Sequence, residues 1–442
     1  MTPDARSESL RAATAAAERP AAEAERLGGF LQLYYRDLAT EDLVAQRPED
    51  LLGAAMSHRD FAATREPGTA LVRVLSPQPW STGRGVVQIV TDDMRFLVDS
   101  LIAELHLQGR PIHLTAHPQL RVVRGEHGEL GEISAATDTA AADAVPESWI
   151  QIFIGPEPDA RAREELTERL HEVLADVRVA VADWRAMTAR ASEIATELAT
   201  GPPASVPARE AAQGAALLEW LVDGEFVFLG YREYRLADPG PASSAVPDAA
   251  LPADRAAGDP VPTGRDDADS DGAGPTDAVS SDEPDGPRVV LEPVPGTGLG
   301  LLREDRPGAR PARPTVLTGR VAQKAGEPRL LIITKANSRS TVHRPLYLDY
   351  IGVKTFDDAG RVTGERRFLG LFTSSAYNTS VTQVPYVAEK VQRVVAASGY
   401  PLGSHLERDL VEVLETYPRD ELFATDVDRI TEIAQAVVHL QE

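Results

Sequence analysis

The sequence predicts an α+β fold in which two sheet-and-helix modules are joined and flanked by helical segments. The chain has 442 residues, of which 43% are hydrophobic, so it is too long for one hydrophobic core and apolar enough to fold as several domains. Strand-like apolar runs and segments of helical periodicity occur together in residues 67–183 and again in residues 225–402. These two regions are the expected modules.

The first segment, residues 1–66, is expected to be helical. Phe30, Leu33 and Tyr34 recur at helical spacing in an Ala-, Leu- and Glu-rich context. Pro48 lies where a new helix can begin, because the first turn of a helix does not use its N–H groups.

Residues 67–183 are expected to form the first module. Its strands are predicted at 69–75, 85–92, 112–123, 149–154 and 177–181, and its helices at 94–109 and 159–175. From residue 86 to residue 181 the order is β-α-β-β-α-β, which is the ferredoxin-like pattern. Because this fold serves many functions, the topology alone does not select one.

The second module, residues 225–402, follows a helical connector at 184–224 and precedes a C-terminal helical segment at 403–442. We expect the same βαββαβ order here. Strands are predicted at 226–236, 330–334, 346–356 and 365–373, with a hairpin turn at 357–360. A helix at 384–397 should begin at a cap formed by Ser380 or Thr382 and end at Gly399. Further helices are expected at 406–414 and 426–440, and the pattern runs to the last residue, so the chain is expected to continue beyond it.

Within the second module, residues 237–288 consist mainly of Asp, Gly, Pro, Ser and Ala. A segment with so few large apolar side chains cannot offset the entropy lost on ordering. We expect a solvated, disordered insertion, and an acidic interaction tail is the alternative reading.

Composition excludes several classes of partner and site. The net charge of −23 opposes binding to nucleic acid or to an anionic membrane. The chain has no cysteine, which excludes disulfides, thiolate zinc sites and a cysteine nucleophile and is typical of the reducing cytoplasm. The N-terminus lacks the apolar stretch of a secretory signal, and no apolar run approaches the roughly 18 residues of a spanning helix. We therefore expect a cytoplasmic protein.

Polar side chains at the junction between a predicted strand and helix form the first candidate site. Asp92 and Asp93 can cap the helix that follows, which would explain them without a ligand. Arg95 follows these two acids in the same turn.

The second candidate is a polar block at residues 335–344. It contains Asn337, Arg339, His343 and Arg344 among several hydroxyl groups. Arg339 or Arg344 could bind a carboxylate or phosphate through two parallel hydrogen bonds. The favoured alternative is that these groups satisfy the loop backbone and pair with acids such as Asp349 at an interdomain contact.

Two other patterns do not support a site. His113 and His117 have the spacing of a helical metal site, but in a strand they would lie about 13 Å apart. The glycines at 296, 298 and 300 do not match the G-x-G-x-x-G spacing of a dinucleotide loop. The sequence therefore predicts no metal ligand, no cofactor-binding residue and no catalytic residue in this chain.

Three segments carry a resemblance to a known family: DDMRFLVDSLIAEL at 92–105, WLVDGEFVFLGYREYRL at 220–236, and the polar and apolar stretch at 330–377. They resemble the N-terminal regulatory region of the large bacterial NAD-dependent glutamate dehydrogenases. The resemblance implies two ACT-like modules in a homo-oligomeric enzyme that uses NAD to deaminate glutamate to 2-oxoglutarate and ammonia. Here no lysine stands in a Lys-Gly-Gly context, so the catalytic dehydrogenase domain is expected beyond residue 442.

The resemblance leaves two roles open for the modules, namely sensing of an amino-acid effector at Asp92–Arg95 and assembly of the oligomer. Assembly is favoured because it needs no pocket. The alternatives are a free-standing ACT-type amino-acid sensor without enzyme activity, a sensor linked to transcription or phosphotransfer, and a self-contained enzyme. Each of the last two would need a segment or polar cluster that the sequence does not show.

Overall fold

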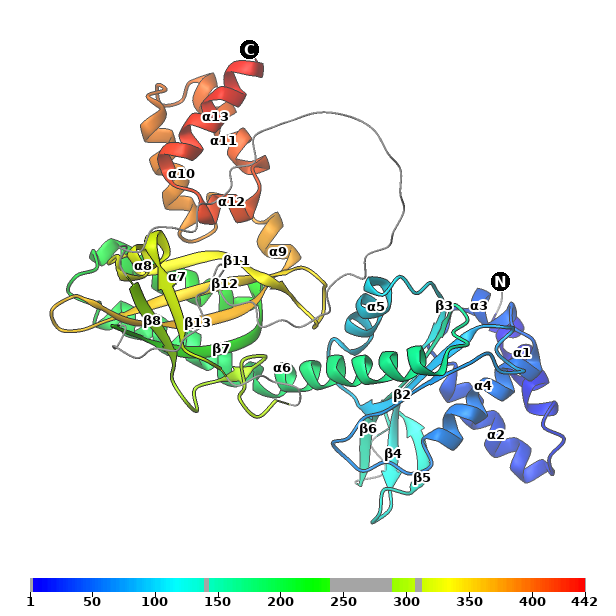
Figure 1. Cartoon of the computed structure of the whole chain (residues 1–442). Coiled ribbons are helices and arrows are strands. Elements are labelled where there is room, and N and C mark those ends of the chain that lie inside the picture. Colours follow the sequence, from blue (N-terminus) through cyan, green and yellow to red (C-terminus); the bar gives the residue numbers. More distant parts are fainter. Residues whose placement is uncertain (1–2, 139–142, 239–287, 307–311, 442) are drawn as a thin grey trace, which may run out of the picture. The chain divides into compact units, whose positions relative to one another are not determined.

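The computed structural model describes residues 3–138, 143–238, 288–306 and 312–441, drawn as ribbons in Figure 1. The chain divides into two compact units. Unit 1 is Met1–Val181 with the short segment Thr341–Pro345, and unit 2 is Ala182–Ser340 with Leu346–Glu442. The insertion predicted at 237–288 lies outside the described residues apart from its two ends. None of the helices in the described part combines the length and apolar character needed to cross a bilayer.

Unit 1 begins with helices α1 (Pro3–Ala15), α2 (Ala21–Tyr34), α3 (Thr40–Val44) and α4 (Pro48–Phe61), as the apolar spacing predicted. Pro48 is the first residue of α4, where its missing N–H has no partner to lose. Phe30, Leu31 and Tyr34 of α2 are buried together with Trp149 of the sheet. The N-terminal helices therefore share a core with the strands of unit 1.

The described strands of unit 1 form one antiparallel sheet: β1 (Leu71–Leu75), β2 (Gly85–Asp92), β3 (Ile112–Ala116), β4 (Gln119–Arg124), β5 (Leu130–Ala135) and β6 (Ala144–Ile154). Their order is β1-β2-β6-β4-β5, and β3 also pairs with β6. Helix α5 (Leu97–Leu107) connects β2 to β3. The strand predicted at 112–123 is two strands, because Pro118 has no N–H for a continuous ladder. Strand β5 was not predicted, since its side chains are half or fully exposed and lack a clear alternation.

The last strand predicted for the first module, at 177–181, is wrong. Helix α6 (Ala160–Thr200) runs through these residues without interruption. Leu170, Val173, Leu174 and Val177 are buried at the three- and four-residue spacing of one helix face. The valines favour a strand locally, but this stripe continues the helix. Strand β1 pairs along all its residues with β2 and lies at that edge of the sheet.

Unit 2 is built on a larger antiparallel sheet with the strand order β10-β8-β7-β13-β12-β11, and β9 also pairs with β7. Its described strands are β7 (Phe226–Ala237), β8 (Arg288–Pro293), β9 (Leu299–Gly300), β10 (Thr315–Thr318), β11 (Leu331–Arg339), β12 (Tyr347–Phe356) and β13 (Val362–Phe372). The turn predicted at 357–360 joins β12 to β13, and Gly360 has the positive φ of 78° that such a turn needs.

The order of elements in unit 2 differs from the predicted βαββαβ pattern. Four strands precede α8 (Gly319–Gly326), and three strands follow it before the next helix. The predicted order lacked β8, β9 and β10, because these strands are too short to show periodicity in the sequence. A second ACT-like module is therefore not confirmed.

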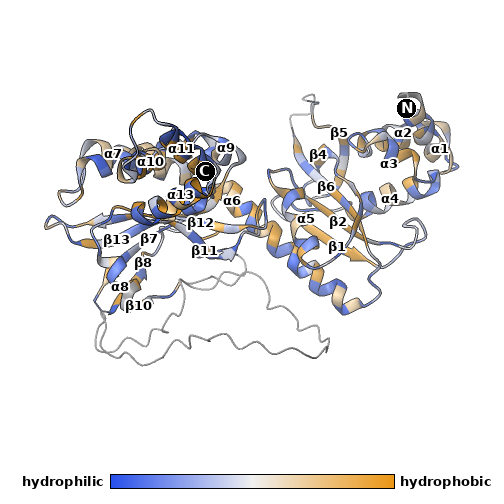
Figure 2. Cartoon of the chain, turned by 90° about the horizontal axis from the view of Figure 1, so that it is seen from above, coloured by the Kyte–Doolittle hydropathy of each residue, from blue (hydrophilic) through white to orange (hydrophobic). Residues whose placement is uncertain are grey.

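Helices cover one face of this sheet, as Figure 2 shows for α7, α10 and α13. The helices are α7 (Ala208–Trp220), which continues into the π-helix η1 (Leu221–Glu225), α9 (Ser374–Asn378), α10 (Val387–Ser398), α11 (His405–Thr416), α12 (Arg419–Ala424) and α13 (Val427–Gln441). Phe228, Ile351 and Phe368 of the sheet share one core with residues of these helices. Helix α8 packs at the other side, where Ala322 meets Leu291 and Leu317.

The predicted start of α10 is wrong and its predicted end is confirmed. Neither Ser380 nor Thr382 caps the helix, because its N-cap is Tyr386 and no side chain caps it. Ser380 instead donates to the carboxylate of Glu415. Gly399 closes the helix in the left-handed conformation at a φ of 71°.

Candidate functional site

The first predicted site lies in unit 1, between the end of β2 and the start of α5. Asp92 is the last residue of β2, and the N-cap of α5 is Phe96 in the left-handed conformation, without a side-chain cap. The prediction that Asp92 or Asp93 caps this helix is therefore wrong. Both carboxylates have other partners in the fold.

Asp92 bridges two arginines. Its Oδ1 accepts from Nη2 of Arg65 at 2.8 Å, and its Oδ2 accepts from Nη1 of Arg178 at 2.6 Å. Burial opposes ionisation of Asp92, but the hydrogen bonds and charges of these two arginines outweigh it and hold the pKa of the carboxyl below its ordinary value. Asp92 is therefore ionised and paired at neutral pH.

Asp93 and Arg95 differ in how they are used. Oδ1 of Asp93 accepts from Ser148 Oγ at 2.6 Å and from Gln119 Nε2 at 3.1 Å, so this carboxylate is bound to the neighbouring strands. Arg95 is exposed, and the described part of the chain offers it no hydrogen-bond or ion-pair partner. Of the three predicted residues, Arg95 alone has no side-chain partner among the described residues.

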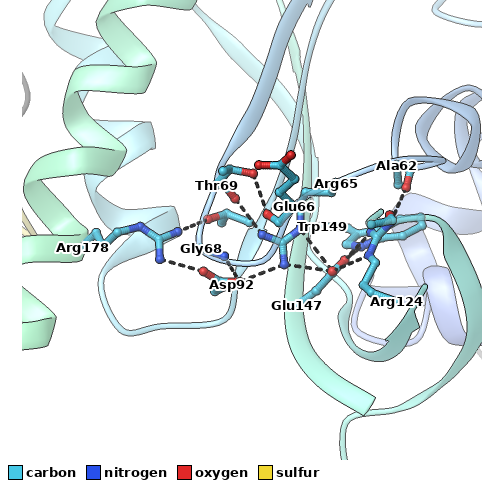
Figure 3. A network of polar contacts seen from close by, with 12 residues as sticks. Ala62, Arg65, Glu66, Gly68, Thr69, Asp92, Arg124, Glu147, Trp149 and Arg178 are labelled. Atoms are coloured by element: carbon cyan, nitrogen blue, oxygen red, sulfur yellow. Dashed lines mark hydrogen bonds and ion pairs between the residues drawn. The ribbon is translucent and has the colours of Figure 1, made fainter. Parts of the chain in front are cut away.

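Asp92 belongs to a larger network of charged side chains that the sequence did not reveal, shown in Figure 3. The second acid of this network is Glu147 on β6, which is fully buried. Arg65 donates to Glu147 Oε1 through Nε at 3.1 Å and Nη2 at 2.9 Å. Arg124 binds both carboxylate oxygens at 2.8 Å, and Trp149 Nε1 donates to Oε2 at 2.9 Å. The ionised groups therefore alternate in sign from Arg178 to Arg124.

The network ties the N-terminal helical segment to the sheet of unit 1. Nη1 of Arg124 donates to the carbonyls of Ala62 and Gly128 at 2.7 and 3.0 Å, and Nη1 of Arg65 donates to the carbonyl of Thr69 at 2.6 Å. Burial opposes ionisation of Glu147, but the hydrogen bonds and charges around it still hold the pKa of its carboxyl below the ordinary value. With every carboxylate oxygen engaged, the arrangement is suited to stability rather than to proton transfer.

The second predicted site is divided between the two units. Asn337 and Arg339 lie on β11 in unit 2, because that strand extends to Arg339 and not only to residue 334. The guanidinium of Arg339 lies over the ring of Tyr347, 5.1 Å from its centroid. His343 and the partly buried Arg344 belong to unit 1.

The pairing predicted for Asp349 is made by Lys335. Its Nζ lies 2.6 Å from Asp349 Oδ1 and 3.1 Å from Asp420 Oδ2. Lys335 and Asp349 are directly opposite each other on β11 and β12, so this pair lies within unit 2. Phe372 N donates to the other oxygen of Asp349 at 3.0 Å, which leaves the carboxylate fully engaged.

The structure brings His343 to the start of α5, beside the first predicted site. The His343 backbone N–H donates to Ser100 Oγ at 2.9 Å, and Nδ1 of its ring lies 3.1 Å from Asp99 Oδ2. Its ring packs against Phe96 at a centroid distance of 4.9 Å. No sequence signal could relate residues so far apart along the chain.

The two remaining patterns are the histidine pair and the glycines at 296, 298 and 300. His113 is exposed on β3, and His117 Nε2 lies 2.9 Å from Ser148 Oγ. Across the described ranges no group of three or more His, Asp or Glu side chains is placed to hold a metal ion. Gly300 lies in β9 beside β7, and its N–H donates to Asp183 at 2.8 Å.

Comparisons with known proteins match two regions of the chain to family models. Residues 30–170 match the glutamate dehydrogenase ACT1 domain, and residues 384–442 match glutamate dehydrogenase helical motif 1. The first match covers most of unit 1, including the turn at Asp92 and the strand that carries Glu147. The second covers α10 to α13.

Curated relatives match nearly the whole chain. An NAD-specific glutamate dehydrogenase of Halomonas elongata is 31% identical over 95% of this chain, and that of Pseudomonas aeruginosa is 33% identical over 93%. A third, from Mycobacterium tuberculosis, is 27% identical over 89%. The chain spans only 23%, 23% and 20% of the lengths of these relatives. The resemblance seen in the sequence is therefore confirmed, and the chain carries the ACT1 domain and helical motif 1 of the glutamate dehydrogenase family.

Proposed function

We propose that this chain is the N-terminal region of an NAD-specific glutamate dehydrogenase and serves assembly and regulation of that enzyme rather than catalysis. The observation that supports this most is coverage, since relatives of that name match 95% and 93% of the chain within 23% of their own length. The complete enzyme would deaminate L-glutamate to 2-oxoglutarate and ammonia with NAD, and its dehydrogenase domain would be the main partner of this region. A cytoplasmic location is part of the proposal, in keeping with the cysteine-free composition.

Assembly is the favoured role within this proposal. Asp92 and Asp93, which a bound amino acid would have to approach, are already engaged by arginines, Ser148 and Gln119. Both sheets have edge strands, β1 and β5 in unit 1 and β10 and β11 in unit 2. Edge strands carry backbone groups that can pair with another copy of the chain. We therefore expect a homo-oligomer.

An immunoblot of source cells tests whether the chain is part of a larger enzyme. An antibody against the purified chain should detect a polypeptide much larger than the 47.6 kDa of the chain itself. The larger polypeptide should co-purify with glutamate-dependent NADH formation. A single band at the mass of the chain, without that activity, would favour the free-standing sensor.

Amino-acid sensing at the start of α5 is the second candidate, and the free side chain of Arg95 favours it. A ligand present at 100 times its dissociation constant should stabilise the folded chain by about 2.7 kcal/mol. In a thermal-shift screen of amino acids, Arg95→Ala should reduce any stabilisation, whereas Arg36→Ala, at another exposed arginine of unit 1, should not. A screen without a stabilising amino acid, together with oligomers in light scattering, would support assembly alone.

A further inference from the structure

A cavity of about 340 Å³ lies in unit 2 beside α8 and the edge strand β11, and Tyr386, Phe423 and Ala424 of the C-terminal helical segment also line it. This volume is at the lower end of the range found for small-molecule sites. Its apolar wall is formed by side chains from β7, β8, β10, α8 and β11, namely Leu236, Leu291, Leu317, Val321 and Ile332. Val321 is 49% exposed, so the cavity opens to solvent beside α8.

The sheet contributes a polar floor to this cavity. Tyr350 and Lys354 of β12 and Glu365 and Arg367 of β13 line it, and all four are buried. Residues of the same parity share one face of a strand, and the register places Lys354 opposite Glu365 and Gly352 opposite Arg367. Gly352 has no side chain, and the ring of Tyr350 fills the position over it, because a Cβ there would lie 3.1 Å from Tyr350 Cε1.

Arg367 is held between two aromatic rings and the carboxylate of Glu365. Rings from the two neighbouring strands flank its guanidinium, with centroids at 3.9 Å for Tyr234 and 4.8 Å for Tyr350. Its Nε donates to Glu365 Oε1 at 2.8 Å. Nη2 forms an ion pair with the same oxygen at 2.6 Å, and no other acceptor among the described residues reaches this buried nitrogen. Because a guanidinium has five N–H groups, donors remain besides those directed at Glu365.

Lys354 adds a second buried cation. Its Nζ donates to the carbonyls of Lys324 and Glu327 at 2.6 and 2.8 Å, at the end of α8. No carboxylate of the described residues lies within ion-pair distance of it, and burial lowers the pKa of its ammonium. A buried charge that lacks an opposite charge is costly.

The charges around the cavity favour an anion. Its buried floor holds two cations, Arg367 and Lys354, and one carboxylate, Glu365. At the exposed rim, Lys324 and Arg329 face one acid, Glu327, and Arg329 lies 3.4 Å from Asp426. The buried excess is therefore one positive charge, next to an apolar wall.

We propose that this cavity binds a small organic monocarboxylate with an apolar body. The carboxylate lies beside Arg367 and Lys354, where it balances the buried excess charge. The apolar body packs against Leu291, Leu317 and Val321. A neutral apolar molecule would leave the excess charge unbalanced, and this site is separate from the turn at Asp92 and from the role proposed for the chain.

Calorimetric titration of the purified chain tests the proposal with octanoate as the probe and 1-octanol as its neutral counterpart. Octanoate should bind saturably at one site per chain and at least about tenfold more tightly than 1-octanol. Absence of saturable octanoate binding, or equal affinity for the two molecules, would overturn the proposal.

A pair of variants on α8 locates the site. Val321→Trp should fill the cavity and weaken octanoate binding by at least about tenfold, whereas Gln323→Trp, which is exposed on the same helix and outside the lining, should leave it within about twofold. Substitution of the buried Arg367 can disturb the sheet, so the α8 pair decides the test. Equal binding by both tryptophan variants would place octanoate elsewhere and refute the assignment.

Discussion

Glu147 is the residue on which the buried charges of unit 1 depend, because it is the acceptor shared by Arg65, Arg124 and Trp149 (Figure 3). Arg65 is 1% exposed, and among the residues that the structure describes Asp92 is its only other acid. Removal of one partner from a buried ion pair is strongly destabilising, since the charges left behind cannot reach water.

The substitution Glu147→Gln should therefore lower the free energy of unfolding by about 3–5 kcal/mol. Glu165→Gln is a matched control, because Glu165 pairs with Arg161 at the surface, where the two side chains are 62% and 85% exposed. The control should change stability by less than about 1 kcal/mol. Urea unfolding followed by circular dichroism measures both, and equal effects would show that the network does not stabilise the unit.

His58 is buried as a neutral ring by two fixed hydrogen bonds. Its Nε2 donates to the carbonyl of Ile89 at 3.1 Å, so Nδ1 accepts from the hydroxyl of Tyr34 at 2.7 Å. Burial is the main cause that lowers the pKa of His58 to about 3. Between that value and the ordinary pKa near 6.5, the unfolded chain binds one more proton than the folded chain.

Stability from His58 should therefore decrease as the pH falls below about 6.5. In the variant His58→Gln, the loss of stability relative to the parent chain should be largest at pH 7 and smaller by about 2 kcal/mol at pH 5. Unfolding free energies of both chains across this range measure the difference. The exposed His106→Gln is the matched control, and a constant difference for His58→Gln across this range would mean that the folded chain takes up this proton as the unfolded chain does.

At the scale of single elements, the helix α12 illustrates how helical motif 1 is held together. Nζ of Lys390 on α10 donates to the carbonyls of Leu422, Phe423 and Thr425 at 2.7, 2.9 and 2.9 Å. These are carbonyls at the end of α12 that lack helical partners. Burial is the main cause that lowers the pKa of Lys390 to about 8.

Because the folded pKa of Lys390 is below its unfolded value near 10.5, the unfolded chain binds more protons between these two values. The contribution of Lys390 to stability should therefore rise by about 2 kcal/mol from pH 8 to pH 10. Lys390→Met should lose this rise, whereas Lys324→Met, at an exposed lysine, should keep it. If the unfolding free energies of the parent chain and of Lys390→Met changed equally from pH 8 to pH 10, the expectation would be wrong.

The sequence was sufficient for elements whose periodicity is long and regular. Strand β2 was predicted with its exact bounds, and the helices before Ala63 and after His405 were expected because their apolar residues recur at helical spacing. Strands β8, β9 and β10 were not predicted from the sequence, since two to six residues are too few to show a period. At 177–181 a local preference of valine for strands competed with the helical stripe of α6, and burial of the stripe decided the outcome.

The candidate site was less predictable than the fold, because its partners are distant along the chain. Asp92 stands before a helix and satisfies the sequence pattern of a cap, yet Arg65 and Arg178 bind it from 27 and 86 residues away. Isolated arginines carry no periodic signal. His343 of the second predicted site lies beside the start of α5 at the first, and only the tertiary structure brings them together.

At the scale of the whole molecule, catalysis should be absent from the chain by itself. The sequence has no dinucleotide fingerprint and no lysine in a Lys-Gly-Gly context. The purified chain should therefore form no NADH from glutamate and NAD above a mock preparation, and NAD should not shift its melting temperature. Measurable glutamate-dependent NADH formation would show that the chain is a self-contained enzyme.

Net charge should govern how copies of this chain assemble. With a net charge of −23, two copies repel each other at low ionic strength, and at about 0.1 M salt charges separated by more than roughly 10 Å are screened. Added salt screens this repulsion and so strengthens association through strand edges or apolar surface. It also screens attraction between opposite charges and so weakens association through ion pairs. We therefore expect the fraction of oligomer in light scattering to rise with sodium chloride at fixed protein concentration. A fall in that fraction would indicate that ion pairs between copies, rather than edge strands such as β1, hold the assembly.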